Sequence, residues 1–269
     1  MDHRKTAAVV CGLLVAATVT FGQESIPAGT ILPVRLDTAI SSQARPGTRV
    51  RGTVMQEVRL PAELRIQRGA KVVGEIVAVA PVAGSQDGAG QTGTSGQGAR
   101  VSIRFGSLVL GKRTIPITAN LRAIASFMEV ESAQVPTSGP DRGTWAGVWT
   151  TRQIGGEMVY RGGGPVSDGA LVVGRPVADG VLARVLSEPE EGCRGEVDGN
   201  DREQSLWVFS ASACGVYGMR NVKIAHAGRD EPAGEITLES DRGKLKIPSG
   251  SGMLLRVIGG ALNQAEPKG

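Results

Sequence analysis

Two cysteines and one histidine are the side chains of this 269-residue chain with the most evident potential for chemistry. Cys193 and Cys214 follow an N-terminal stretch that has the features of an export signal, and two cysteines in an oxidising compartment most often pair. A bridge between them would close a loop of about 22 residues and stabilise the fold by roughly 3 kcal/mol. We therefore predict a Cys193–Cys214 disulfide. In the alternative, Cys214 is a nucleophile and His226 its base, which would require a reduced thiol and a third, orienting group.

The other polar candidates point to no defined site. His226 has no second histidine after residue 22 to complete a metal centre, so a structural role is favoured. The carboxylates near Cys193 do not follow the spacing of a calcium-binding loop. Their positions in the sequence do not indicate which two could act as a catalytic pair, so the hydrolysis of a glycoside stays an open alternative. We predict no catalytic residue, no metal ligand and no cofactor. These carboxylates are Glu188, Glu190, Glu191, Asp198, Asp201 and Glu203.

Aromatic residues gather in one part of the chain. Residues 143–239 hold all three tryptophans, and Trp145 and Trp149 are four positions apart. In a regularly alternating strand, residues four apart face the same side. The sequence therefore offers Trp145 and Trp149 as a platform on which a sugar ring could stack.

The N-terminus predicts export. Arg4 and Lys5 precede the apolar stretch 7–19, and small residues follow up to Gly22. This is the pattern of a secretory signal peptide at 1–22, and the apolar stretch is too short to cross a membrane. We expect a mature chain with no transmembrane span, located in the periplasm or outside the cell, with outer-membrane association left open.

Composition indicates a β-rich fold with many turns. Glycine makes up 39 of the 269 residues and aromatics only 3%. The net charge is +4, and no run of five like charges occurs. Because nucleic-acid binding requires a concentrated basic patch, we expect no nucleic-acid partner.

A turn followed by a strand recurs along the chain. Residues 26–36, 66–74 and 247–257 each contain an apolar residue, two further residues, a glycine, a small residue and an apolar run. Glycine permits a positive φ, so each copy predicts a tight turn that enters a strand. Pro33 within the first strand favours an edge position, since proline cannot donate to a ladder. The polar, glycine-rich segment 83–98 predicts a flexible loop between two strands.

These patterns predict a mostly β fold, a barrel or sandwich closed by its N- and C-terminal strands. One domain would comprise 23–135 plus 243–260. A Gly/Trp/Cys-rich, disulfide-bearing insertion would occupy 136–242, after a change of composition near Gly139.

The N-terminal half and the last strand resemble a known family. The residues concerned include the turns at Gly29 and Gly69, the segment 105–108 and the ending 245–250. Over 26–124 and 243–258 the chain is similar to the C-terminal β-barrel of TrbI-like proteins, which are channel-forming core components of type IV secretion and conjugation systems. Those proteins have a cytoplasmic N-terminus, a transmembrane helix and a helical antenna, whereas this chain has a signal peptide and a Cys- and Trp-rich middle.

We therefore expect an exported, non-enzymatic cell-envelope protein that acts as a structural or interaction module similar to secretion-channel scaffolds. Its partners would be envelope proteins or further copies of itself. The alternative is a secreted hydrolase or a protein that binds carbohydrate or peptidoglycan.

Overall fold

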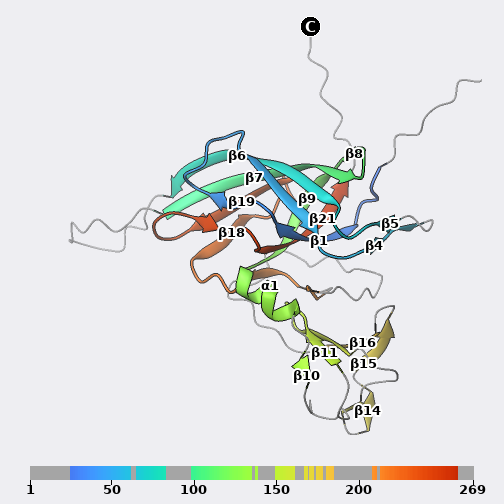
Figure 1. The fold of residues 1–269 in the computed structure, drawn as a ribbon. Coiled ribbons are helices and arrows are strands. Elements are labelled where there is room, and N and C mark those ends of the chain that lie inside the picture. The colour runs from blue at the N-terminus through green and yellow to red at the C-terminus, as the bar shows by residue number, and fades with distance from the viewer. Residues whose placement is uncertain are drawn as a thin grey trace, which may run out of the picture.

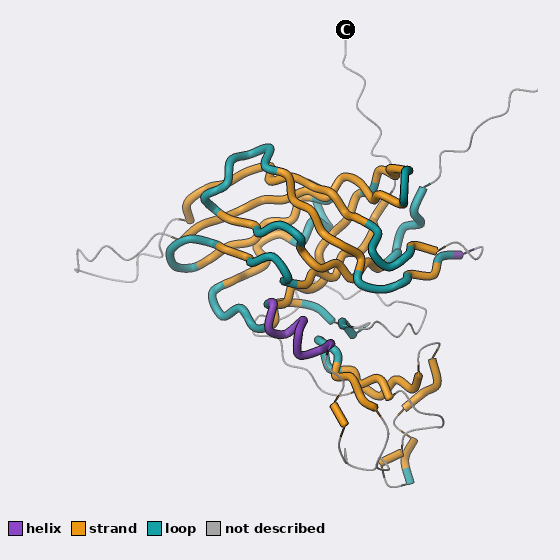
Figure 2. The backbone as a smooth tube through the Cα atoms, viewed as in Figure 1, coloured by secondary structure: helices purple, strands orange, loops and turns teal. Residues whose placement is uncertain are grey.

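The structure is a computed structural model. It describes residues 25–61, 65–82, 98–134, 137–138, 149–160, 167–168, 170–172, 174–177, 180–184, 208–210 and 213–259. Strands dominate this part of the chain, and one α-helix, α1 (Phe127–Gln134), lies among them (Figure 2). The mostly β prediction is confirmed.

Ten strands form one large mixed sheet in the order β17-β9-β21-β1-β3-β6-β7-β19-β18, with β8 paired to β7. Every ladder in it is antiparallel except that between β17 and β9. The strands are β1 (Ile31–Leu36), β3 (Arg49–Val54), β6 (Lys71–Val82), β7 (Gly98–Leu110), β8 (Arg113–Pro116), β9 (Thr118–Ala125), β17 (Gly215–Tyr217), β18 (Val222–His226), β19 (Glu235–Ser240) and β21 (Gly252–Gly259).

The first and last strands of this sheet pair with each other, but they do not close a barrel. The ladder between β1 and β21 runs from Ile31 opposite Arg256 to Arg35 opposite Gly252, and it lies in the interior of the sheet. The edge strands are β17 and β18, and no ladder among the described residues joins them. A single backbone bond, from the Leu121 N–H to the Ala227 carbonyl at 2.8 Å, connects β9 to the end of β18. The predicted closed barrel is therefore wrong.

The edge position predicted for β1 is wrong. Leu32, Val34 and Leu36 are buried in the main hydrophobic core, while on the other face Ile31 and Pro33 are also buried and only Arg35 is exposed. Although β1 lies between β21 and β3, its ladder to β3 begins only at Val34. Pro33 precedes that ladder, so its missing N–H costs no bond to β3.

Four tight turns of one kind lead into the central strands. In each turn the N–H of the fourth residue donates to the carbonyl of the first, and the third residue is a glycine with φ between 84° and 92°. This is the geometry of a type II turn, which requires a positive φ at that position. We call these the strand-entry turns: residues 27–30, 45–48, 67–70 and 248–251, which lead into β1, β3, β6 and β21.

Each strand-entry turn also forms hydrogen bonds with a residue of a neighbouring strand. The Gly29 N–H donates to the Val257 carbonyl at 2.7 Å, and the Val257 N–H donates back to the Thr30 carbonyl at 2.8 Å. The turn before β21 holds Leu36 of β1 in the same way, so β1 and β21 hold each other at both ends. The turns before β3 and β6 do the same through Ile76 and Val54. The centre of the sheet therefore consists of two strand pairs, β1 with β21 and β3 with β6, and in each pair the turn before one strand bonds to the other strand.

A second sheet follows α1 in the chain, and Figure 1 shows it below the helix, apart from the main sheet. Strands β17 to β19, although they fall within the predicted insertion at 136–242, pair with strands of the main sheet, so the boundary at 242 does not match the edge of that sheet. The order of the second sheet is β10 (Thr137–Ser138), β11 (Trp149–Arg152), β12 (Glu157–Tyr160), β16 (Gly180–Arg184) and β15 (Gly174–Val177).

Three two-stranded ladders complete the described elements. The pair β4 and β5 forms an arm at the right of Figure 1, next to the start of β6. The ladders are β2 (Ile40–Ser41) with β20 (Lys246–Ile247), β4 (Val58–Arg59) with β5 (Arg65–Ile66), and β13 (Ser167–Asp168) with β14 (Leu171–Val172).

Candidate binding sites

The first candidate site is a basic cleft of about 550 Å³ between the β5–β6 connection and the β7–β8 hairpin. Four of its ten lining residues are cations, and the rest are apolar residues, glycines and one glutamine. We call it the basic cleft: Arg65, Gln67, Arg68, Gly69, Ala70, Lys71, Val109, Leu110, Gly111 and Arg113.

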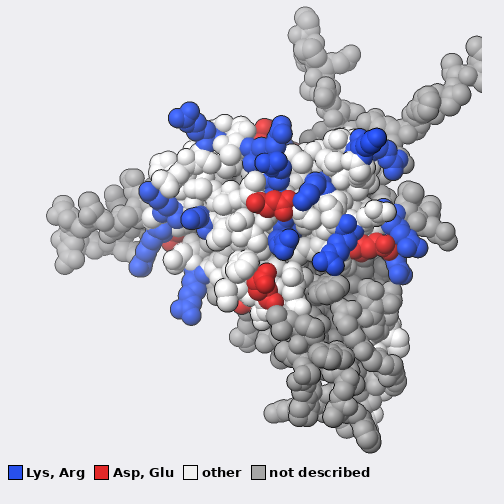
Figure 3. All heavy atoms as spheres, viewed as in Figure 1, with Lys and Arg blue, Asp and Glu red and all other residues white. Residues whose placement is uncertain are grey.

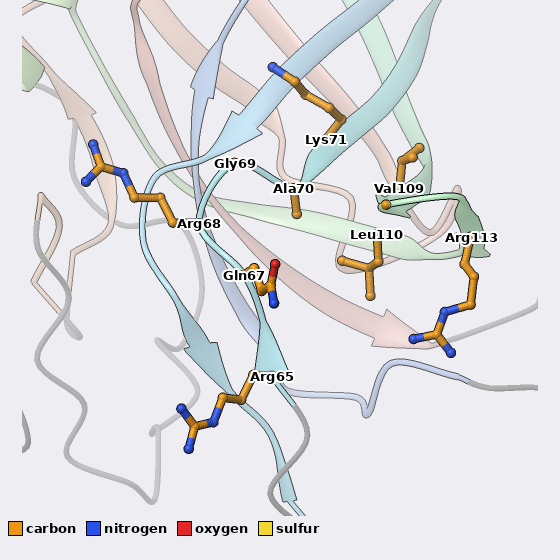
Figure 4. Close-up of a pocket in the computed structure, with 10 residues that line it drawn as sticks. Arg65, Gln67, Arg68, Gly69, Ala70, Lys71, Val109, Leu110 and Arg113 are labelled. Atoms are coloured by element: carbon orange, nitrogen blue, oxygen red, sulfur yellow. The ribbon is translucent and has the colours of Figure 1, made fainter.

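The cations of the basic cleft come from different elements. In Figure 4, Arg65 and Arg68 lie on one side of Gln67 and Leu110, Arg113 lies on the other, and Lys71 extends away at the upper end. The space-filling view shows Lys and Arg side chains spread over the visible face, including that near β4, β5 and the β7–β8 hairpin, where acidic side chains lie among them (Figure 3). The cleft brings together cations from two separate segments of the chain, 65–71 and the β7–β8 hairpin.

Two of these cations make ion pairs. Arg65 Nη1 lies 3.3 Å from Glu57 Oε1, and Lys71 Nζ lies 3.1 Å from Asp37 Oδ2. The side chains of Arg65 and Lys71 are still 59% and 51% exposed. Exposed ion pairs of this kind contribute little to stability, about 0–1 kcal/mol each, so they leave the cations accessible to a stronger anion.

The second candidate site is a groove of about 910 Å³ beside α1. One wall is the start of the helix, where Phe127 is 43% and Met128 is 70% exposed. The opposite wall is formed by the turn after β17 and the end of β20. We call it the helix groove: Ser126, Phe127, Met128, Glu129, Gly218, Met219, Arg220, Asn221, Val222, Lys246, Pro248 and Ser249.

Local sequence explains why the helix sits there. The Ser126 hydroxyl accepts a hydrogen bond from the Glu129 N–H at 3.3 Å, as expected of an N-cap residue. The helix packs closely on a strand-entry turn, since a Cβ on Gly250 would lie 2.5 Å from Phe127 Cδ2. A Cβ on Gly218 would lie 2.5 Å from the Ser126 hydroxyl oxygen. Both glycines thus allow the start of α1 to approach the sheet.

Cys214, the predicted site residue whose side chain the structure describes, lines neither candidate site. Cys214 is buried and disulfide-bonded, whereas Cys193 lies outside the described residues, so their pairing stays a prediction. Trp149 begins β11, but its side chain and the whole of Trp145 lie outside the described part, so the stacking platform also stays a prediction. The carboxylates between 188 and 203 lie outside it as well.

His226 lies in the hairpin between β18 and β19. Its Nδ1 is 2.6 Å from the Glu235 carbonyl oxygen and 3.2 Å from the Gly228 nitrogen. These contacts tie the ring to the hairpin backbone, as expected of a structural histidine. Among the described residues, no three His, Cys, Asp or Glu side chains come close enough together to hold a metal ion.

The chain was compared with known proteins. No family model, no curated protein and no solved structure matches it. The TrbI-like resemblance therefore stays a prediction. Within the residues that the structure describes, no helix has the length and apolar character needed to cross a membrane.

Proposed function

We propose that this protein is an exported, non-enzymatic module of the cell envelope that assembles with further copies of itself through the helix groove. The observation that carries the proposal is the exposure of Phe127 and Met128 at the start of α1, in a groove that also contains Met219 and Val222. Grouped, exposed large apolar side chains mark surfaces that bind other proteins.

The charges on the two walls favour a second copy as the occupant. The helix wall carries Glu129, and α1 has no basic residue, whereas the opposite wall carries Arg220 and Lys246, both exposed. In a two-fold interface, the acidic wall of each copy would face the basic wall of the other, and the apolar residues would meet between them. The groove is therefore chemically complementary to itself.

Self-association is tested with the mature chain by sedimentation velocity over a range of concentrations. Wild type is expected to form dimers, and Met128→Asp is expected to weaken dimerisation at least 10-fold, because it places a carboxylate in the apolar contact. Val172→Asp is the matched control, since Val172 is 58% exposed on β14 and does not line the groove. A wild type that stays monomeric at every concentration contradicts the proposal.

A charge exchange makes the test specific for the two-fold arrangement. Glu129→Lys alone and Lys246→Glu alone each place like charges on facing walls, so each variant is expected to dimerise weakly. An equimolar mixture restores opposite charges across both halves of the interface and is expected to form mixed dimers. If the mixture dimerises no better than the single variants, the facing walls are not those proposed.

Export and the disulfide are tested together on protein purified from the envelope fraction of its native cells. The intact mass is expected to correspond to a chain without residues 1–22. Alkylation is expected to add mass to Cys193 and Cys214 only after reduction, because both thiols are oxidised in an exporting compartment. Alkylation of either cysteine without reduction would contradict the disulfide, and a mass that includes residues 1–22 would contradict cleavage of the signal.

A further inference from the structure

We propose that the basic cleft is a binding site for a phosphate ester. This site is independent of the helix groove, because the two share no residue. The proposal rests on the charge of the cleft, the composition of its walls, its size and the hydrogen-bonding capacity of its arginines.

The cleft and its immediate surroundings carry a surplus of positive charge. Arg65, Arg68, Lys71 and Arg113 line it, and Lys112 lies next to Arg113 in the chain, whereas none of the ten lining residues is acidic. Glu57 pairs with Arg65, and Asp37 pairs with Lys71. An anion in the cleft therefore experiences net attraction.

Glu57 does not use up the donors of Arg65. Arg65 contacts Glu57 through Nη1, and a guanidinium carries five N–H donors in a planar fork. The fork of an arginine matches two oxygens of a phosphate, which binds more strongly than a single exposed carboxylate contact. Arg65 can thus hold Glu57 and still donate to a ligand.

The residues that line the cleft suit a phosphate group that is attached to an uncharged organic group. Ala70, Val109 and Leu110 provide an apolar surface between the cations. The turn glycines Gly69 and Gly111 leave open space, since a Cβ on either would meet no atom within 4 Å. A volume of about 550 Å³ is in the usual range for small-molecule sites, roughly 300–1,000 Å³. A sugar ring or glycerol unit could lie on the apolar surface while its phosphate contacts the arginines.

Two sources supply this chemistry, namely a soluble sugar or glycerol phosphate and the headgroup of a phospholipid. The test therefore has two arms. In the first, calorimetry measures binding of glycerol 3-phosphate and glucose 6-phosphate to the mature chain. In the second, the protein is sedimented with vesicles of phosphatidylcholine containing one quarter phosphatidylglycerol, at low and high salt. Binding in the first arm assigns a soluble ester, binding in the second alone assigns a lipid headgroup, and both support the proposal.

The decisive variant is Arg68→Gln combined with Arg113→Gln, which removes one arginine from each side of the cleft. It is expected to weaken binding at least 10-fold. Arg45→Gln combined with Arg242→Gln removes the same charge from residues that do not line the cleft and is expected to change binding less than 2-fold. Arg68→Lys combined with Arg113→Lys keeps the charge but loses the planar fork, and intermediate binding is expected.

Three results would overturn the proposal. The first is that the wild type binds neither the soluble esters nor the vesicles. The second is that the cleft variant and the control variant lose the same amount of binding affinity. The third is that the lysine variant binds as tightly as the wild type. The second and third results would show that the ligand is attracted to positive charge in general and that the cleft does not bind it specifically. The thermal unfolding midpoint of each variant is measured alongside, and if the glutamine variant unfolds, the lysine variant decides the test.

Discussion

Gly74→Ala is expected to destabilise the fold by about 3 kcal/mol, because a methyl group at this position would overlap the backbone of the adjacent strand. Gly74 lies on β6, where the ladder to β7 shifts register between Val73 and Gly74. A Cβ there would collide with the Arg104 carbonyl oxygen and would lie 2.9 Å from Phe105 Cδ1. A carbonyl within a ladder cannot move without breaking hydrogen bonds, and Phe105 is fully buried in the core.

Gly106→Ala is the matched control for this change. Gly106 lies on β7 as part of the same strand pair, and a Cβ there would meet no atom within 4 Å. Its replacement is expected to change the free energy of unfolding by less than about 0.5 kcal/mol. Urea denaturation of both variants, with the disulfide state held constant, measures the difference. Equal destabilisation by the two substitutions would show that the close approach at Gly74 does not determine stability.

Gly250→Ala is expected to destabilise the fold by about 2–3 kcal/mol through two separate effects. The first is the positive φ of 87°, which costs an L-residue about 1–2 kcal/mol. The second is the contact of the new Cβ with the ring of Phe127 at 2.5 Å, which must push the helix away. Gly47→Ala isolates the first effect. It changes an equivalent strand-entry turn with φ of 84° and the same pattern of backbone bonds, but no atom lies within 4 Å of its Cβ.

Chemical denaturation of single and double variants separates the two effects. With Phe127→Ala as the background, Gly250→Ala is expected to cost about as much as Gly47→Ala, because the colliding ring is gone. In the sedimentation experiment, Gly250→Ala is also expected to weaken dimers, since it displaces Phe127 in the helix groove. If Gly250→Ala costs the same with and without the Phe127 ring, the turn does not position the helix.

Sequence reasoning worked best where a residue pattern determines the backbone directly. The turns at Gly29, Gly69 and Gly250 were predicted from their glycines, and all three have the expected positive φ. The fourth strand-entry turn, residues 45–48, is not among the copies found in the sequence. It begins after Ala44, a small residue in place of the isoleucine of the other copies, so its likeness to them is weak in the sequence and evident only in its hydrogen bonds.

Features that depend on distant residues could not be predicted. The segment 119–130 shows no clear hydrophobic period in the sequence, because β9 is buried on both faces while α1 buries only Val130 and Ala133. The basic cleft depends on the β7–β8 hairpin lying beside the β5–β6 connection, which brings Arg68 and Arg113 to opposite sides of one cleft. No run of like charges in the sequence indicates this cleft. The pairing of the first and last strands was foreseen, but not their place in the interior of the sheet.

The interior position of β21 determines when this fold can form during synthesis. Strand β21 lies between β1 and β9, so each of them lacks one of its two neighbouring strands until residues 252–259 have left the ribosome. The reciprocal hold between the turn at Gly29 and Val257 joins residues more than two hundred positions apart, and such non-local contacts make folding slow. The central part of the sheet therefore cannot be completed until nearly the whole chain has been made.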